Sequence, residues 1–386
     1  MKHSIIILLV GMAMAQPEEG EIGTIEEHVI AVSEGGSYNI MGNLSLWGVA
    51  SSNGDSLLPY YMHRVELGFD MTFDSWLFGF VRLQSWGNEM NYNSLNIPEA
   101  YVEAYFADWF SFRGGKQLLT YCNGLTWSDI RRGYPAVSLL FGDNISLNLH
   151  GIYTAPAAIG ENPSWMAGGI GGAGLGPVYL SVYGLVRPTP LDTVHTDIWA
   201  GGELELAHSF FRLSLEGASF SRDTVNAISG VATADLTASA FNIGVGLMEL
   251  DSAWVNPFGQ SPRLYYDERG WGGPGEVYTF TYAADPFLDG AENLSAINAH
   301  IGYSHYLDFI RPDLMLNARV DYFRLASALT NDSLLTIGDE IDLALNFSVP
   351  KTVNFGLVGG YLMASDSAYK DGYAVRAWIA KDFFFE

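Results

Sequence analysis

The sequence has little of what usually stabilises a secreted protein, and it has little positive charge. Cys122 is the only cysteine among 386 residues, so no intrachain disulfide can form. Lysine and arginine total 19 against 43 aspartate and glutamate residues, for a formal net charge of −24. Proteins that bind nucleic acid need a basic surface, so this balance argues against a nucleic-acid partner.

Long hydrophobic runs are also missing. The apolar run Ile5–Val10 is short, and no later stretch approaches the roughly 18 consecutive apolar residues that a spanning helix needs. The first residues instead resemble a secretory signal, with Lys2, this apolar run and small residues before Gln16. We therefore predict a signal peptide at 1–15, followed by an acidic, flexible N-terminal segment at 16–36.

Spacings that mark metal or catalytic sites are absent as well. The eight histidines show no H-x-x-x-H or H-x-H spacing, so we predict neither a metal site nor a cofactor. Glu99 and Glu103 would lie about 13 Å apart along one strand, too far for a glycosidase pair. Residues 169–174 match the dinucleotide pattern G-x-G-x-x-G, but a strand pattern rather than a helix follows them. We predict that the protein is not an enzyme.

What the sequence does contain is a two-residue alternation along most of its length. In the stretch 338–349, one side carries Ile341, Leu343, Leu345, Phe347 and Val349, and the other carries Glu340, Asp342, Ala344, Asn346 and Ser348. Successive side chains of a strand point to opposite faces, so this segment has one apolar and one polar face. The same pattern recurs at 64–73, 99–106, 145–153, 211–216 and 314–322.

The connections between these strands come in two kinds that alternate. Short turns are expected near Asp74, Asp108, Asp143, Gly176, His208 and Pro350. Long polar connections are expected at 51–60, 87–97, 120–133, 155–163, 188–196, 221–236, 327–337 and 365–372. This asymmetry is typical of outer-membrane barrels, which have short periplasmic turns and long external loops. Soluble sandwiches with Greek-key links have no reason to show it.

The alternation also predicts the number of strands. The first lies near 37–50 and the last near 371–384, and strict parity requires a short turn near 250–253 with a weak strand after it. The sequence thus predicts an all-β fold, a transmembrane antiparallel up-and-down β-barrel of about 18 strands that forms one domain over 37–386. A barrel of this size encloses an aqueous lumen rather than a packed core.

Aromatic residues gather near the ends of the expected strands, as in the girdles of membrane barrels. They are Trp47, Trp76, Trp86, Trp109, Tyr153, Tyr303, Tyr306, Tyr361 and Phe383 to Phe385. The alternative interpretation is that aromatic residues are simply common in strands.

Charged side chains occupy the face expected to line the lumen. The candidate lining residues are Arg64, Arg82, Arg113, Arg212, Arg319 and Arg376, with Glu66, Asp70, Glu99, Glu103, Glu203, Glu205, Glu216, Asp321, Glu340 and Asp342. These groups could select permeant solutes, or they could pair across strands and stiffen the wall. Because the acids outnumber the bases, we expect a weak preference for cations or a neutral solute.

Two further arginines lie in a long connection. Arg131 and Arg132 follow Trp127 and Asp129, and they would reach a constriction if this connection folds into the lumen. Alternatively, they are solvated or pair with surface acids.

Three stretches resemble the alginate-export family of outer-membrane porins. Residues 115–121, G-K-Q-L-L-T-Y, are similar to the family's G-R/K-Q-x-L-x-Y-G run and are followed by W-S-D at 127–129 and R-R-G at 131–133. Residues 338–343, G-D-E-I-D-L, are similar to its G-x-E-x-D-L run, and N-P-F at 256–258 with L-Y-Y at 264–266 is a weaker match. Cys122 and the final Glu386 depart from the family. The resemblance implies a porin fold and does not imply that alginate is the solute.

These observations favour one function over two alternatives. We expect a porin of the outer membrane of a diderm bacterium, through which small hydrophilic solutes or ions diffuse passively. Its partners would be outer-membrane lipid and the barrel-assembly machinery, and the sequence leaves the oligomeric state open. The first alternative is a plugged barrel with a structural or adhesive role through its external loops. The second is a soluble secreted β protein.

Overall fold

The computed structural model describes residues 37–52, 57–88, 94–121, 125, 133–142, 145–154, 164–189, 195–257, 294–328, 334–349, 353–365 and 369–385. The expected signal peptide and the acidic segment at 16–36 lie outside these residues, as do Cys122, Arg131 and Arg132. Among the described residues, no helix is long and apolar enough to cross a membrane.

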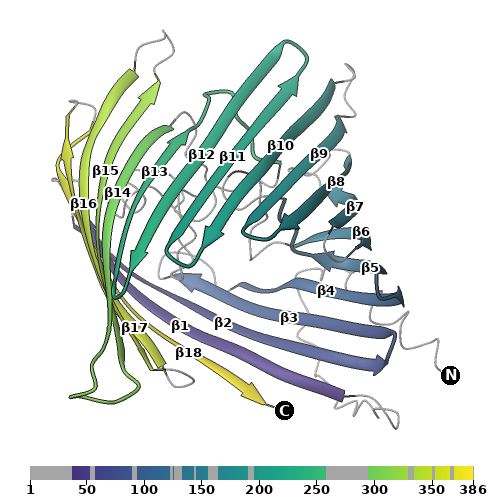
Figure 1. Ribbon diagram of the computed structural model, residues 1–386, viewed down its shortest axis with the longest axis horizontal. Helices are drawn as coiled ribbons and strands as arrows, with labels where there is room; N and C mark the ends of the chain where they lie inside the picture. The colour runs from purple at the N-terminus through teal and green to yellow at the C-terminus, as the bar shows by residue number, and fades with distance from the viewer. Residues whose placement is uncertain are drawn as a thin grey trace.

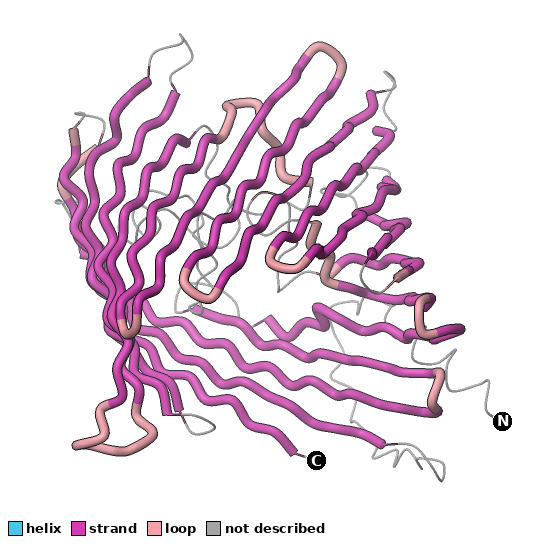
Figure 2. The backbone as a smooth tube through the Cα atoms, viewed as in Figure 1, coloured by secondary structure: helices cyan, strands magenta, loops and turns pink. Residues whose placement is uncertain are grey.

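The described chain forms eighteen strands that close into one barrel (Figures 1 and 2). They are β1 Ser37–Ser52, β2 Leu57–Asp74, β3 Leu77–Asn88, β4 Ser94–Ala107, β5 Phe110–Gln117, β6 Tyr134–Phe141, β7 Ile145–Thr154, β8 Ser164–Leu175, β9 Val178–Thr189, β10 His195–His208, β11 Phe211–Arg222, β12 Val225–Ala238, β13 Phe241–Glu249, β14 Leu294–Tyr306, β15 Met315–Ala328, β16 Leu334–Val349, β17 Val353–Ala364 and β18 Gly372–Phe385. Each strand pairs antiparallel with the next in sequence, and β18 pairs with β1. The predicted fold class and strand number are confirmed.

The two faces of the barrel wall differ in polarity as the alternation predicts. On β16, the apolar side chains Ile341 and Leu343 are 47% and 48% exposed, whereas Glu340 and Asp342 are 0% and 7% exposed. A soluble protein would bury the apolar face instead. The apolar residues therefore form the outer, lipid-facing surface, and the carboxylates point inward. This strand is the third from the end, as the loop parity predicts.

Most connections agree with the predicted alternation. Two-residue turns lie at 75–76, 108–109, 176–177 and 209–210, all at the same end of the barrel, which we call the short-turn end. A longer turn at 307–314 joins β14 to β15 and projects beyond its neighbours (Figure 1). We call the opposite end of the barrel the long-connection end.

The predicted long connection at 221–236 is wrong. A tight turn at Asp223 and Thr224 joins β11 directly to β12, and the two strands pair from Arg222–Val225 to Phe211–Leu236. The outward face of β12 carries Gly230, Ala232 and Ala234, and the inward residues between them are Val231 and Thr233, so the two faces differ little in polarity. Without that contrast, the period of two is hidden and the stretch reads as a polar loop.

The predicted short turn at 250–253 and the weak strand after it are wrong for a related reason. The true turn lies at Ser239 and Ala240, so β13 follows it and pairs directly with β14. Residues 250–253 instead begin the long connection from β13 to β14. The prediction thus omits β12 and adds a strand after residue 253, so the predicted number of strands is still correct.

Several of the predicted aromatic residues lie on the outer surface near the ends of strands. Trp76, Trp109 and Tyr306 are 49%, 59% and 53% exposed at the short-turn end. Trp47 does not follow this pattern. It is buried on the inner face, where it lies directly opposite Trp378 of β18.

Candidate channel lining

The candidate lining residues within the described ranges share the inner face of the barrel. Directly paired residues of neighbouring strands lie on the same face, and the register links these residues around the wall. The inner-face set is Arg64, Glu66, Asp70, Arg82, Glu99, Glu103, Arg113, Glu203, Glu205, Arg212, Glu216, Arg319, Asp321, Glu340, Asp342 and Arg376. Arg131 and Arg132 lie outside the described residues.

Many of these charges are paired within the wall. The two partners of each ion pair lie on the same strand or on adjacent strands. The ion pairs are Arg64–Glu66 at 2.7 Å, Arg82–Glu99 at 3.0 Å, Arg113–Glu103 at 2.6 Å, Arg212–Glu205 at 3.0 Å and Arg319–Asp321 at 2.6 Å. The interpretation of a stiffened wall therefore has direct support, and it does not exclude selection of solutes by the same charges.

A cluster that the sequence interpretation missed lies toward the long-connection end. Asp197 on β10 is fully buried and accepts hydrogen bonds from Arg187 on β9 and Arg222 on β11, each through Nε and Nη2. The guanidinium groups lie over the rings of Trp199 and Phe220. Arg187 and Asp197 border the predicted long connection at 188–196, and Arg222 falls within the one predicted at 221–236. The two-residue alternation of the flanking strands continues into both predicted connections, and following it would have placed these three residues on the inner face.

The connection after β5 folds into the barrel. Tyr121 is buried, with its ring 5.5 Å from His150 of β7 and 5.7 Å from Tyr183 of β9. Burial raises the pKa of the Tyr121 phenol, so this side chain is neutral. Further along, the Leu125 amide donates to Glu216 Oε1 on β11 at 2.9 Å. Arg131 and Arg132, the residues predicted to reach a constriction, belong to this connection but lie outside the described residues.

The connection after β13 also folds inward and meets the first one. Trp199 Nε1 donates to the Val255 carbonyl at 2.7 Å, and Asn256 Nδ2 donates to the Leu125 carbonyl at 3.0 Å. Trp254 is buried beside them. Two connections that are more than 100 residues apart are thus tied to each other and to the wall at β10 and β11.

Among the described residues, the barrel interior has a covered part and an open part. Toward the long-connection end, the inward side chains of Leu185, Trp199 and Leu325 are completely buried. Toward the short-turn end, inward groups such as Arg212 and Thr237 are exposed. We call this open part the short-turn vestibule.

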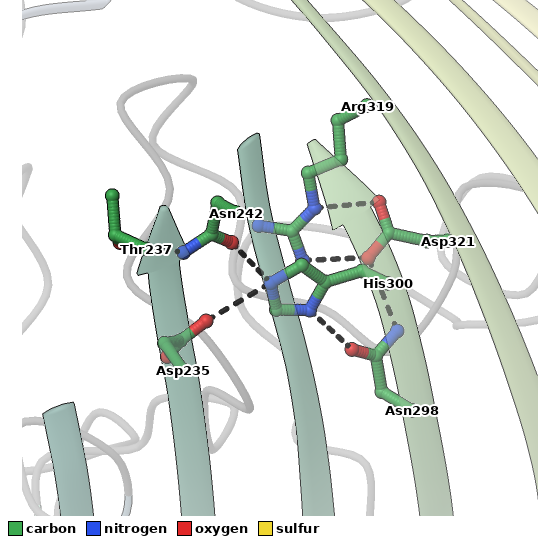
Figure 3. Close-up of polar contacts among 7 residues, drawn as sticks. All are labelled: Asp235, Thr237, Asn242, Asn298, His300, Arg319 and Asp321. Atoms are coloured by element: carbon green, nitrogen blue, oxygen red, sulfur yellow. Dashed lines mark hydrogen bonds and ion pairs between the residues drawn. The ribbon is translucent and has the colours of Figure 1, made fainter. Parts of the chain in front are cut away.

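A polar network on β12 to β15 borders the vestibule (Figure 3). His300 lies at its centre, between Asp235, Asn242 and Asn298. Asn298 continues the network to Asp321, which also holds Arg319. Within the described ranges, no three or more His, Cys, Asp or Glu side chains gather as metal ligands would.

The chain was compared with protein families, curated proteins and solved structures, and only the solved structures match it. No protein-family model and no curated protein matches the chain. Solved structures do match: OpdO of Pseudomonas aeruginosa has a TM-score of 0.61 at 11% identity, with 90% of this chain and 98% of that chain covered. The outer membrane protein OpdK of the same species has a TM-score of 0.59 at 12% identity, covering 90% and 99%. OccAB2 of Acinetobacter baumannii has a TM-score of 0.57 at 12% identity, covering 90% and 98%.

The chain therefore has the barrel fold of these three structures. The likeness extends over nearly the full length of both chains, so no large part of the neighbours' barrels is missing here. It supports the porin part of the sequence resemblance and does not single out the alginate-export family.

Two glycines of the resembling motifs have local backbone roles in this porin barrel. Gly115 has φ +134°, and a Cβ there would lie 2.3 Å from the Ala100 carbonyl oxygen. Gly338 follows the bulge at which β16 shifts register against β15, and a Cβ there would lie 2.3 Å from the Met363 carbonyl oxygen. Only glycine fits either position without a shift of the neighbouring strand. These motif glycines are therefore explained by barrel geometry rather than by a particular solute.

Proposed function

We propose that the protein is an outer-membrane channel for the passive diffusion of small hydrophilic solutes or ions. The observation that carries this proposal is the inner face of the closed barrel, where charged side chains line the wall opposite an apolar outer surface. Water and ions require polar groups along their path.

The balance of charge favours cations or neutral solutes. Glu203 and Glu216 lie directly opposite each other on β10 and β11, at the level where Leu125 binds the wall. Both residues are buried on the inner face, and we expect a path beside them to favour positive or neutral solutes. The preference should be weak, because many other acids are paired with arginines.

A plugged barrel is the second candidate, since the two inward-folded connections cover the long-connection end. In that case the external loops, rather than a lumen, would carry a structural or adhesive role. Liposome swelling separates the two candidates. Proteoliposomes should swell with small sugars at a rate that falls as the sugar becomes larger, and no swelling with any sugar would support the plug.

Planar bilayers test the channel more closely. Purified protein should produce discrete conductance steps, and heat-denatured protein from the same preparation should produce none. Reversal potentials in a salt gradient should indicate a weak cation preference. Clear anion selectivity would contradict the proposed role of the lumen carboxylates.

Export and assembly also belong to the proposal. We expect cleavage before Gln16 and insertion by the barrel-assembly machinery. N-terminal sequencing of the protein extracted from outer membranes should begin at Gln16. An intact Met1 on the membrane form would contradict the signal-peptide assignment.

A further inference from the structure

A buried histidine on the lumen wall has oxygen acceptors on both sides of its ring (Figure 3). His300 Nε2 lies 2.9 Å from Asp235 Oδ1 and 2.8 Å from Asn242 Oδ1, and its Nδ1 lies 3.2 Å from Asn298 Oδ1. The amide of Asn298 is held in this orientation, because its Nδ2 donates to Asp321 Oδ1 at 3.1 Å and to the Tyr322 carbonyl. Both ring nitrogens therefore face groups that can only accept.

This arrangement distinguishes the two charge states of the ring. An imidazolium donates from both nitrogens, and it therefore has a donor for the acceptors on each side of the ring. A neutral imidazole donates from one nitrogen only, so the other nitrogen points a lone pair at an oxygen. Loss of the proton from His300 must weaken the contact on one side of the ring.

A glycine makes the contact between His300 and Asp235 possible. Asp235 lies on β12 and His300 on β14, so the two side chains meet across β13. Gly244 of β13 lies directly opposite both residues. A Cβ on it would lie 2.3 Å from His300 Cε1 and 2.4 Å from Asp235 Oδ1.

The other charges around His300 come from the neighbouring strands. On β15, Arg319 and Asp321 form an ion pair. On β11, Arg212 lies opposite Asp235 and pairs with Glu205.

On β16, Asp342 lies opposite Asp321. The charge that varies belongs to the His300–Asp235 pair, which carries zero when His300 is protonated and −1 when it is neutral.

We propose that His300 makes the ion selectivity of the channel depend on pH, through the charge of Asp235 on the vestibule wall. The Asp235 side chain is 21% exposed, so its charge acts on ions in the vestibule. Protonated His300 neutralises that charge, and deprotonation restores it. This inference rests on the proposed channel function and names one residue that sets its selectivity.

The expected effect follows from Coulomb's law. One unit charge about 7 Å from an ion in water, screened by about 0.1 M salt, changes the cation-to-anion permeability ratio by roughly two- to threefold. The ratio should therefore be higher by this factor when His300 is neutral than when it is protonated. Higher salt should reduce the effect.

Reversal potentials at pH 5 and pH 8 test the proposal in planar bilayers. His300→Gln keeps a polar side chain without the charge change, and it should make the permeability ratio the same at both pH values to within the scatter. Gly244→Ala should do likewise by separating His300 from Asp235. His305→Gln changes a histidine on the opposite face of the same strand, and it should keep the wild-type pH dependence. Equal pH dependence in wild type and His300→Gln would overturn the proposal.

A second measurement does not require conduction. NMR of the protein with isotope-labelled histidine, with the His300 signal assigned by its absence in His300→Gln, reports the charge of this ring directly. The ring shifts should change between pH 5 and pH 8, and a constant spectrum would overturn the inference. If no preparation conducts, the channel function fails, and the NMR result still shows whether His300 changes charge.

Discussion

Replacement of Asp197 by asparagine is the sharpest test of how the barrel wall is held together. Asp197 is completely buried and accepts four hydrogen bonds from Arg187 and Arg222, at distances of 2.5 to 3.1 Å. The change keeps the size of the side chain and removes its charge. Two arginines would then face each other without the carboxylate between them.

The cost can be worked out from these contacts. Hydrogen bonds to a charged group contribute about 1.5–3 kcal/mol each, and neutral ones about 0.5–1.5 kcal/mol. The arginine side chains are 23% and 42% exposed, so water screens part of the loss. We therefore expect Asp197→Asn to lower the free energy of unfolding by about 2–3 kcal/mol. With a urea m value of about 2 kcal/mol per M, the midpoint would fall by about 1 M or slightly more.

Equilibrium unfolding in urea, followed by heat-modifiable gel migration, measures this change. Asp313→Asn is the matched control, because Asp313 also pairs with an arginine, Arg311, through two hydrogen bonds, but it lies on an exposed turn. The control should unfold at the wild-type urea concentration. Equal midpoints for Asp197→Asn and wild type would refute the reasoning, and equal shifts in both variants would show that burial is not the cause.

Two further predictions concern the constriction and the motif glycines. Glu216→Gln should weaken the hydrogen bond from the Leu125 amide by about 1 kcal/mol, and single-channel records should then show more frequent transitions to larger conductance. Glu205→Gln, which removes another lining carboxylate away from the inward-folded connections, should leave that frequency unchanged, and equal frequencies in both variants would refute the role of Glu216. Gly338→Ala should destabilise the barrel by about 1–3 kcal/mol in urea unfolding, because the added Cβ collides with the Met363 carbonyl. Gly48→Ala should cause no loss, since no atom lies within 4 Å of the added Cβ, and a similar loss in both variants would contradict the steric explanation.

The two-residue alternation predicts a strand only where large apolar residues alternate with polar ones. On β16, large apolar residues alternate with acids, so both the strand and its inward face could be predicted. On β12, alanine and glycine replace the large outward residues, and the same geometry leaves almost no alternation to read. The strand forms anyway, because its backbone pairs with β11 and β13 along its length. The pairing of a strand with its neighbours involves residues from other parts of the chain, so it cannot be predicted from a short stretch of sequence.

The sequence by itself determined the barrel architecture of this protein and the inward side of the candidate charges on its predicted strands. It could do so because a strand exposes alternate residues to opposite faces, and this relation is local. Only the tertiary structure decided which charges meet. The Asp197 cluster joins three strands, His300 reaches Asp235 across Gly244, and Leu125 binds Glu216 from 91 positions away. These contacts depend on the stagger between strands and on the closure of the barrel, which the period of two leaves open.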